Sequence, residues 1–293
     1  MTDASERRTE APPRGTLYVV ATPIGNLGDL SPRAAEVLRT VKAVAAEDTR
    51  RTRQLYAHLS APAPVFISLP AFDERGRLGP ILDRLVAGEE IALCTDAGTP
   101  GVSDPGQALV DAAWELGARV VPIPGPCAAV AALAASGLPS DRFLVAGFLP
   151  RKGGSRAEAL AWLAQVPATL VIYEAGNRTA GTLRDLAASL GPRPAALARE
   201  LTKLHEEIVR GTLADLALRF EGEVRGEVTL VISGAPAAQA TVADSEDVDL
   251  ELRRRVAAGE PPTEIARSVA RERGLKRGEV YARLEQLKRS DPE

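Results

Sequence analysis

The chain has 293 residues, of which 45% are hydrophobic and 26% are charged, a balance typical of a globular protein that excludes wholesale disorder. Its formal net charge of -3 excludes a globally basic nucleic-acid binder but leaves room for a local basic surface. Aromatic residues make up only 4% of the chain, which argues against reading single strands mainly by stacking bases on rings. At roughly 150 residues a domain, the length predicts about two domains.

Cysteine and histidine are scarce, with two of each in the chain. Cys94 and Cys127 lie in apolar stretches without a Cys-x-x-Cys pair, which argues against a disulfide scaffold and against a zinc site. The longest apolar run, 127–135, is far shorter than the ~20 residues that span a bilayer. Residues 1–14 are polar and broken by prolines, so we expect a disordered tail and no secretory signal. A cytoplasmic enzyme is the expected class.

Short apolar runs alternate with helical patterns in the first half of the chain. Ser31 and Pro32 mark one helix start, because serine caps a helix and proline suits its first turn. The alternation predicts an α/β domain over residues 15–125. We expect strands at 17–21, 43–46, 65–67, 91–94 and 120–123, and helices at 31–40, 80–87 and 107–116.

A second series of apolar runs follows the Pro124-Gly125-Pro126 segment. It predicts a second α/β domain over residues 126–235, with strands at 143–146, 169–173, 195–198 and 228–232. A cleft between two domains is a favoured place for a small ligand.

The last part of the chain has a different composition. Residues 236–249 are small, polar and acidic, and predict a linker, whereas 250–293 read as helical. Gly274 interrupts the helical pattern, which gives a helix-turn-helix outline. Between Arg253 and Arg289, basic residues outnumber acidic ones by 11 to 5. A solvated helical appendage would fit this pattern, but the outline and the charge together favour an RNA-binding-like domain.

Three loops rich in glycine and proline follow predicted strands. The segment 21–32 (ATPIGNLGDLSP) ends where a helix begins, so its backbone amides could face a polar ligand, although it is neither G-x-G-x-x-G nor a P-loop. The segment 94–106 (CTDAGTPGVSDPG) holds more glycine and proline than a turn requires, which favours a ligand loop. The segment 122–137 (PIPGPCAAVAALAASG) has small side chains that would let a bulky, flat ligand come close, or that simply pack a helix tightly.

Two charged segments are candidates for chemistry. In 46–55 (AEDTRRTRQL), carboxylates and arginines follow a strand, where open α/β sheets hold ligands and where arginine could clamp phosphate. A surface network of salt bridges would also explain that segment. In 199–213 (RELTKLHEEIVRGTL), Lys203 could accept a hydroxyl proton if burial lowers its pKa, or it could be a solvated helix residue.

Taken in chain order, these segments together with TLVIYEAGNR and GEVTLVISG resemble the tetrapyrrole methylase superfamily over about residues 15–234. They resemble most closely the branch that methylates small-subunit ribosomal RNA. The resemblance implies two α/β domains with the ligand cleft between them and a small C-terminal helical domain. It further implies methyl transfer from S-adenosylmethionine to the ribose 2′-oxygen of a cytidine in 16S ribosomal RNA within the small ribosomal subunit, by a homodimer.

The resemblance also implies a set of functional residues. Cofactor contacts would fall on Pro23, Ile24, Gly25, Gly98, Thr99, Gly101, Val102, Cys127, Ala128, Tyr173, Glu174, Arg199, Glu227 and Val228. Separately from the resemblance, we expect basic side chains to contact RNA phosphates, namely Arg50, Arg51, Arg53, Arg273, Lys276 and Arg277. A free hydroxyl is a weak nucleophile, so we expect a proton acceptor, either Lys203 or a carboxylate of the Glu47 and Asp48 pair. No metal is expected.

Two other functions fit parts of the sequence. A methylase of the corrin or porphyrin type usually opens with a Gly-x-Gly-Pro-Gly loop and lacks a basic helical tail, whereas this chain opens with Thr22-Pro23-Ile24-Gly25-Asn26. A non-catalytic RNA-binding assembly factor would keep the fold but would not bind S-adenosylmethionine.

Overall fold

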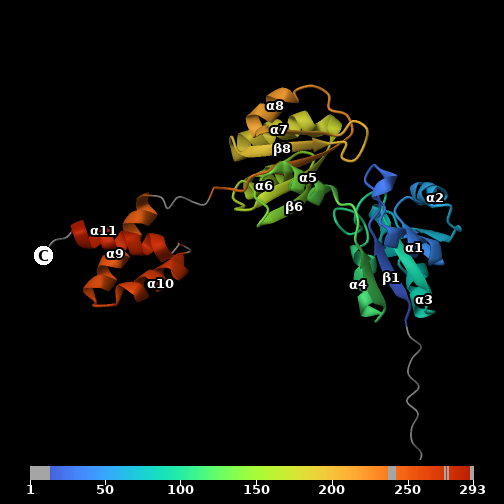
Figure 1. The fold of residues 1–293 in the computed structure, drawn as a ribbon, viewed down its shortest axis with the longest axis horizontal. Helices are drawn as coiled ribbons and strands as arrows, with labels where there is room; N and C mark the ends of the chain where they lie inside the picture. Colours follow the sequence, from blue (N-terminus) through green and yellow to red (C-terminus); the bar gives the residue numbers. More distant parts are fainter. Residues whose placement is uncertain (1–13, 237–241, 274, 276, 291–293) are drawn as a thin grey trace, which may run out of the picture. The chain divides into compact units, whose positions relative to one another are not determined.

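The computed structural model describes residues 14–236, 242–273, 275 and 277–290. The chain forms two compact units, residues 1–235 and residues 236–293, here called the N-terminal and C-terminal units (Figure 1). The N-terminal unit holds two five-stranded sheets, and the described part of the C-terminal unit is helical. The tail predicted at 1–14 lies outside the described residues except for Arg14.

The first sheet is parallel, with strand order β3-β2-β4-β1-β5. Parallel pairing brings the carboxyl ends of these strands to one edge, so the loops that follow them gather there. Helices α1 and α2 cover one face of the sheet, and α3 and α4 cover the other. The strands are β1 (Thr16–Val20), β2 (Ala43–Ala46), β3 (Val65–Ser68), β4 (Glu90–Cys94) and β5 (Arg119–Ile123). The helices are α1 (Pro32–Thr40), α2 (Thr49–His58), α3 (Gly79–Val86) and α4 (Gln107–Glu115), with 3-10 turns at Leu27–Asp29, Ala71–Asp73 and Arg75–Arg77.

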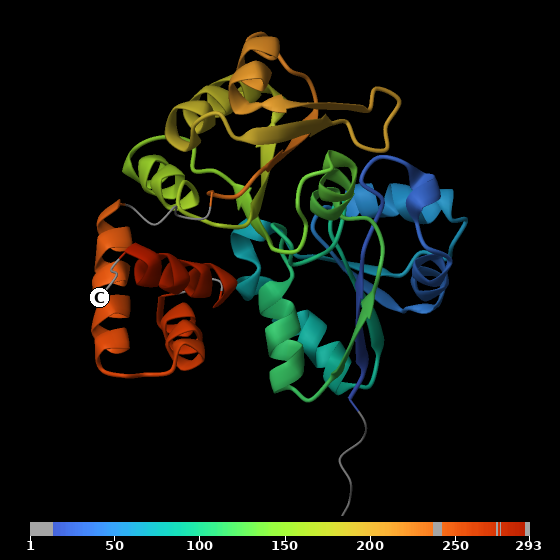
Figure 2. The same ribbon diagram turned by 60° about the vertical axis from the view of Figure 1, so that its left-hand side comes forward.

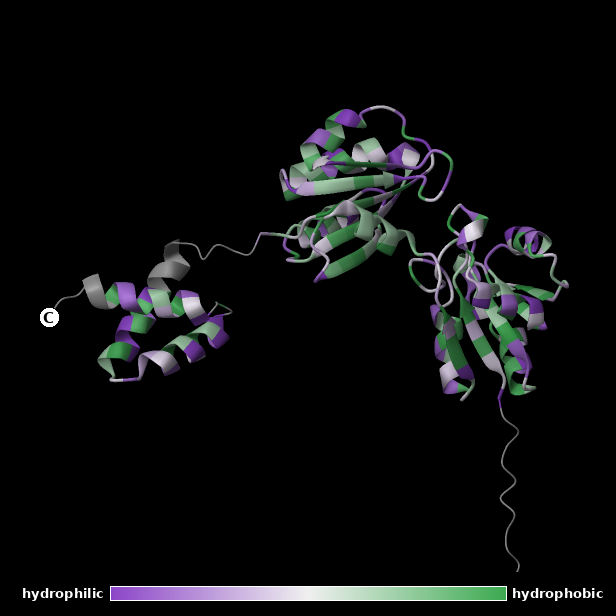
Figure 3. Ribbon diagram, viewed as in Figure 1, coloured by the Kyte–Doolittle hydropathy of each residue, from purple (hydrophilic) through white to green (hydrophobic). Residues whose placement is uncertain are grey.

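The second sheet is mixed, with strand order β6-β7-β10-β8-β9. Only β6 and β7 pair in parallel, and the other neighbours are antiparallel. Helix α5 packs on one face, and α6, α7 and α8 cover the other, so apolar residues concentrate in the sheet (Figure 3). The strands are β6 (Phe143–Phe148), β7 (Thr169–Ala175), β8 (Pro194–Arg199), β9 (Glu207–Thr212) and β10 (Glu227–Ile232). The helices are α5 (Ala128–Ser136), α6 (Gly154–Leu163), α7 (Gly176–Leu190) and α8 (Leu213–Arg219).

The expected helix start at Ser31 is confirmed, because its hydroxyl accepts a hydrogen bond from the Ala34 amide over 3.1 Å. The domain boundary expected at residues 125 and 126 stays a prediction. It agrees with the position of α5, which begins at Ala128 and packs on the second sheet.

The C-terminal unit contains α9 (Val242–Ala257), α10 (Pro262–Arg273) and α11 (Arg277–Ser290). Their shared core buries apolar side chains from all three helices, among them Val248, Leu252, Ile265, Val269, Val280 and Leu284. The linker predicted over 236–249 is wrong from Val242 onward, where α9 begins. Its polar composition concealed the helix, which is stabilised by burial of Val248 and Leu252 one turn apart. No helix in the described ranges is both long and apolar enough to cross a membrane.

Gly176 begins α7 where the chain passes closely over residues 224–226. Its amide donates a hydrogen bond to the Gly226 carbonyl over 2.8 Å, and a Cβ here would overlap the Val224 carbonyl oxygen. We expect Gly176→Ala to lower the free energy of unfolding by about 1–3 kcal/mol, because backbone must move. Gly181→Ala, on the same helix with open space around its Cβ, should raise it by about 0.5–1 kcal/mol through helix propensity. Chemical denaturation measures both, and a neutral Gly176→Ala would contradict the expected overlap.

Candidate functional site

A cavity of about 350 Å³ lies in the N-terminal unit, a volume suited to a small organic ligand. Its wall combines the loops that follow β1, β4 and β5 with the facing ends of β6, β7 and β10. The lining residues are Ile24, Ala97, Gly98, Thr99, Val102, Ser103, Asp104, Cys127, Ala128, Phe148, Tyr173, Glu174, Ala175, Gly226, Glu227, Val228 and Thr229. Both sheets therefore contribute to one site.

Gly98 fixes the loop after β4 against the loop after β1. The Thr22 amide donates to the Gly98 carbonyl over 2.8 Å, and the Gly98 amide donates to the Thr22 carbonyl over 3.0 Å. Gly98 has a φ of 82°, a conformation that side chains disfavour. A Cβ here would lie 3.6 Å from Ile24 Cγ2 and 3.9 Å from the Pro126 carbonyl oxygen, beside the cavity.

The start of α5 connects the two sides of the cavity. The Thr99 hydroxyl donates to the Pro126 carbonyl over 3.2 Å, which holds the loop after β4 against the approach to α5. On the other side, the Ala129 amide donates to the Tyr173 hydroxyl over 3.2 Å. Burial first, and the neighbouring Cys127 next, raise the pKa of Tyr173 to about 12, so this hydroxyl keeps its proton at neutral pH. These bonds connect the first sheet to the second around the cavity.

Asp104 and Glu227 line the cavity, and Glu47 and Asp96 lie outside its lining but close enough to repel the charge of Asp104. Burial, followed by repulsion from Glu47, Asp96 and Glu227, raises the pKa of Asp104 to about 7. Burial is also the largest cause that raises the pKa of Glu47 and of Asp96. The Glu47 carboxylate accepts from the Asp96 amide over 3.2 Å, and the Asp96 carboxylate accepts from the Asp48 amide over 3.1 Å. Within the described residues, no group of three or more histidine, cysteine, aspartate or glutamate side chains could hold a metal ion.

The loop between β8 and β9 projects beyond the strands of the second sheet (Figure 2). Lys203 lies in this loop, not in a helix, and outside the cavity wall. Its ammonium contacts Glu227 Oε2 at 2.8 Å and Glu200 Oε1 at 3.0 Å. Burial alone would lower the pKa of Lys203, but its hydrogen bonds to Glu227 and Glu200 outweigh burial and raise it. A lysine held as a cation by two carboxylates is a poor proton acceptor, which disfavours the base role predicted for it.

Glu174 is buried in the cavity wall, where its carboxylate contacts three neighbouring groups of the protein. Its carboxylate accepts from the Thr182 hydroxyl over 2.6 Å and from the Ala175 amide over 2.9 Å, and it lies 3.2 Å from Arg178 Nε. Arg178 also donates to the Leu149 carbonyl over 3.0 Å, which joins the ends of β6 and β7. The Glu174 carboxylate therefore supports the wall.

We expect Arg178→Ala to lower the free energy of unfolding by about 3–5 kcal/mol, because it leaves the carboxylate of Glu174 buried without its counter-ion. Adding Glu174→Gln to Arg178→Ala should recover part of that loss, because the buried charge is then gone. Thermal and chemical denaturation of the single and double variants measure both effects. A double variant less stable than Arg178→Ala would contradict this role for the pair.

The structure brings most of the predicted cofactor residues to the cavity: Ile24, Gly98, Thr99, Val102, Cys127, Ala128, Tyr173, Glu174, Glu227 and Val228. Four others lie outside its wall, and their predicted cofactor contacts stay predictions. Pro23 lines a separate cavity beside Arg51, and Gly25 packs against the Lys203 side chain. Gly101 faces open space, and Arg199 forms an ion pair of 2.6 Å with Glu207.

Sequence reasoning missed seven residues of the wall: Ala97, Ser103, Asp104, Phe148, Ala175, Gly226 and Thr229. Three of them lie in the loop 94–106, whose density of glycine and proline already indicated a ligand loop. Phe148 ends β6, where a bulge between Val145 and Gly147 shifts the strand register. No sequence signal placed that side chain in the wall.

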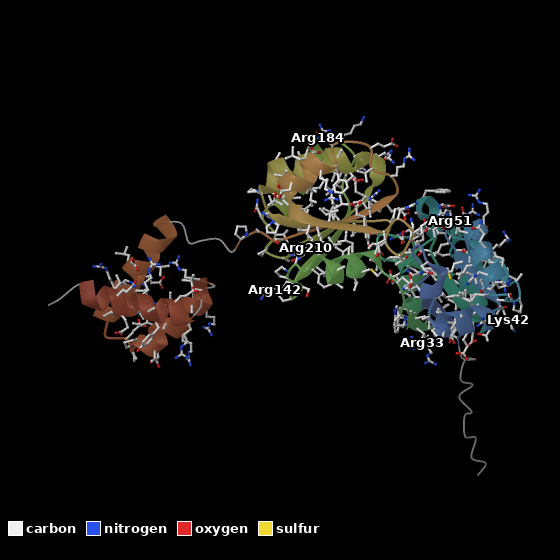
Figure 4. All side chains as sticks on the ribbon, turned by 45° about the horizontal axis from the view of Figure 1, so that its top comes forward. Arg33, Lys42, Arg51, Arg142, Arg184 and Arg210 are labelled. Atoms are coloured by element: carbon white, nitrogen blue, oxygen red, sulfur yellow. The ribbon has the colours of Figure 1, made fainter. Side chains whose placement is uncertain are left out.

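The arginines predicted to contact RNA fall into two groups. Arg50, Arg51 and Arg53 lie in the first turns of α2, and Arg51 is labelled in Figure 4. Arg50 pairs with Asp48 at 2.7 Å, and Arg51 lies 3.4 Å from Asp96. Arg53 stacks over the Phe66 ring at 4.6 Å. The second group lies in the C-terminal unit. There Arg273 pairs with Glu251 at 2.9 Å, Arg277 is exposed at the start of α11, and Lys276 lies outside the described residues.

The fold and the site define a class of α/β protein in which loops from two sheets enclose a cavity for one small organic ligand. The sequence matches the family Tetrapyrrole (Corrin/Porphyrin) Methylases over residues 16–217, and the chain belongs to this family. Solved structures share its fold. Uroporphyrin-III-C-methyltransferase from Thermus thermophilus has a TM-score of 0.54 at 24% identity, covering 75% of this chain and 94% of that one. Diphthine synthase has a TM-score of 0.59 at 16% identity, covering 75% and 90%. The predicted fold class is confirmed.

Curated relatives match nearly the whole chain. A protein of Xylella fastidiosa (strain Temecula1) named Ribosomal RNA small subunit methyltransferase I is 46% identical over 275 residues, covering 91% of this chain and 98% of that protein. A protein of Escherichia coli O157:H7 with the same name is 42% identical over 275 residues, covering 92% and 94%. The resemblance expected from the sequence is confirmed.

Proposed function

We propose that this chain transfers a methyl group from S-adenosylmethionine to the ribose 2′-oxygen of a cytidine in small-subunit ribosomal RNA. The observation that carries the proposal is the convergence of loops from both sheets on one cavity, in a chain of the tetrapyrrole methylase family. The relatives named Ribosomal RNA small subunit methyltransferase I support the RNA substrate, because they match over at least nine tenths of this chain.

The cavity has the chemistry that S-adenosylmethionine needs. Ile24, Val102, Phe148 and Val228 provide apolar surface, and the Asp104 and Glu227 carboxylates in the wall would stabilise a positively charged sulfonium. Gly98 keeps the wall open beside Ile24. The bound cofactor would supply an electrophilic methyl group.

The protein would contribute alignment, exclusion of water and removal of a proton. Alignment of hydroxyl oxygen, methyl carbon and sulfur would provide most of the rate enhancement, because a sulfonium is already a good leaving group. Arg50, Arg51 and Arg53 on α2 would hold RNA phosphates beside the carboxyl edge of the first sheet. Because ribosomal RNA is the proposed substrate, we also propose that the protein acts in the cytoplasm.

Purified protein incubated with S-adenosylmethionine and unmethylated small-subunit RNA, either free or in assembled subunits, tests the proposal. We expect one new ribose-methylated cytidine, found by nuclease digestion and mass spectrometry. Light scattering of the same protein tests the proposed homodimer.

Isothermal titration calorimetry with S-adenosylmethionine, run beside the RNA methylation assay, distinguishes the alternatives. A methylase of the corrin or porphyrin type would bind S-adenosylmethionine in calorimetry and leave both RNA substrates unmodified. An RNA-binding assembly factor would bind RNA and give no heat with S-adenosylmethionine. Either result would contradict the proposed function.

A further inference from the structure

Asp104 lies in the cavity wall where charges from both sheets act on one side chain. It is half-buried and belongs to the loop between β4 and α4. Glu47 and Asp96 act on it from the ends of β2 and β4, and Glu227 acts on it from the start of β10. Burial and this repulsion favour the neutral form of Asp104, so its proton is exchanged near neutral pH.

The backbone around Asp104 is held in an unusual conformation. Ser103 has a φ of 64°, in the left-handed region that residues with a Cβ rarely adopt. Its hydroxyl fits against Gly147 of β6, where a Cβ would lie 3.1 Å from Ser103 Oγ. The end of the same loop is held by Glu74, whose Oε1 accepts from the Gly106 amide over 3.0 Å. Strain that the surroundings maintain at a cavity wall is typical of a functional position.

The other carboxylates are less suited to accept a proton in the cavity. Among the described residues that line it, Glu174 is bound by Thr182 and Arg178, and Glu227 is bound by Lys203. Hydrogen bonds from Arg50 lower the pKa of Asp48 to about 2, which makes it a weak base outside the wall. Glu47 also lies outside the wall and accepts from the Asp96 amide.

We propose that Asp104 is the catalytic residue that accepts the proton of the attacking ribose hydroxyl, an inference that rests on the proposed function. The hydroxyl O–H bond breaks, and the proton passes to a carboxylate oxygen of Asp104. The hydroxyl oxygen bonds to the methyl carbon as the carbon–sulfur bond breaks, and the electron pair of that bond leaves on sulfur as a neutral thioether. No other reactant is required.

Asp104 must be deprotonated to act, so kcat/KM for S-adenosylmethionine, which reports the free protein, should rise with pH through about 7 and level off above it. A cation bound beside Asp104 favours its charged form. S-adenosylmethionine should therefore release a fraction of a proton on binding at pH 7, up to about one half, whereas the neutral S-adenosylhomocysteine should release less. The titratable and charged groups that face Asp104 directly, or through their partners, are Glu47, Asp96, Glu227, Tyr173, Cys127, Arg51 and Lys203.

Asp104→Asn in the full chain tests the assignment, with Asp83→Asn, an exposed residue of α3, as the matched control. We expect Asp104→Asn to lower kcat for RNA methylation about 100-fold or more and to remove the rise with pH. Its Kd for S-adenosylmethionine should stay within a few-fold, and the proton release measured by calorimetry in buffers of different ionisation enthalpy should disappear. Asp83→Asn should behave as the unmodified protein in all these measurements.

Three results would overturn the assignment: wild-type kcat in Asp104→Asn, undiminished proton release, or a loss of cofactor affinity as large as the loss of kcat. Circular dichroism and thermal melting show whether Asp104→Asn is folded, and if it is not, Asp104→Glu replaces it, with the expectation of a shifted pH profile. Failure of the proposed function is a separate result, because the unmodified protein would then neither bind S-adenosylmethionine nor methylate RNA.

Discussion

Gly98→Val is expected to raise the Kd for S-adenosylmethionine about 10- to 100-fold and to abolish methyl transfer at ordinary cofactor concentrations. The new side chain would start 3.6 Å from Ile24 Cγ2 and would extend beside the cavity wall. Overpacking of this kind costs about 1–3 kcal/mol, which corresponds to that loss of affinity. Isothermal titration calorimetry measures the Kd directly.

Gly101→Val is the matched control for that substitution. Gly101 has a φ of 80°, against 82° for Gly98, so valine introduces similar backbone strain at both positions. No atom lies within 4 Å of a Cβ at Gly101, so the substitution should leave the cavity unfilled. Equal losses of cofactor affinity in both variants would mean that loop strain is responsible. They would contradict the role assigned to the space beside Gly98.

The sequence predicts the first sheet more completely than the second. Its parallel strands β2 and β4 are apolar runs buried on both faces, β1 is an apolar run buried at Leu17 and Val20, and turn residues separate these strands from the helices. In contrast, β9 is an edge strand in which only Val209 is buried, so it leaves no apolar run to detect. The sequence therefore does not predict the antiparallel hairpin of β8 and β9. For the same reason, it does not place Lys203 in the loop between these two strands.

The sequence predicts only part of the candidate site. Glycine and proline in the loop 94–106 indicate a ligand loop, because special backbone conformations need those residues. The raised pKa of Asp104 depends on Glu47, Asp96 and Glu227, which come together only when both sheets are folded. Ion-pair partners also decide which arginines and lysines can still bind phosphate, as the pairing of Arg273 with Glu251 shows. No local pattern in the sequence predicts such long-range pairings.

Removal of residues 236–293 is expected to weaken RNA binding at least about tenfold while leaving the Kd for S-adenosylmethionine unchanged. The N-terminal unit is compact by itself and contains the whole cavity. In the C-terminal unit, Arg255, Arg273 and Arg283 form ion pairs with the carboxylates of Glu251, Glu272 and Asp249. Among the other arginines that are exposed on its described helices, four are candidates for phosphate contacts: Arg254, Arg267, Arg271 and Arg277.

Replacing those four arginines with glutamine in the full chain tests how much their charge contributes to RNA binding, apart from the rest of the C-terminal unit. If they bind phosphates, the slope of log Kd against log salt should fall by up to about four, and the affinity should fall towards that of the truncated chain. Arg184→Gln, on α7 of the N-terminal unit, is the control for loss of an exposed positive charge elsewhere (Figure 4). Filter binding across a salt series measures each slope. If the four-residue variant kept its full affinity while the truncated chain lost it, the C-terminal unit would contact RNA through groups other than these arginines.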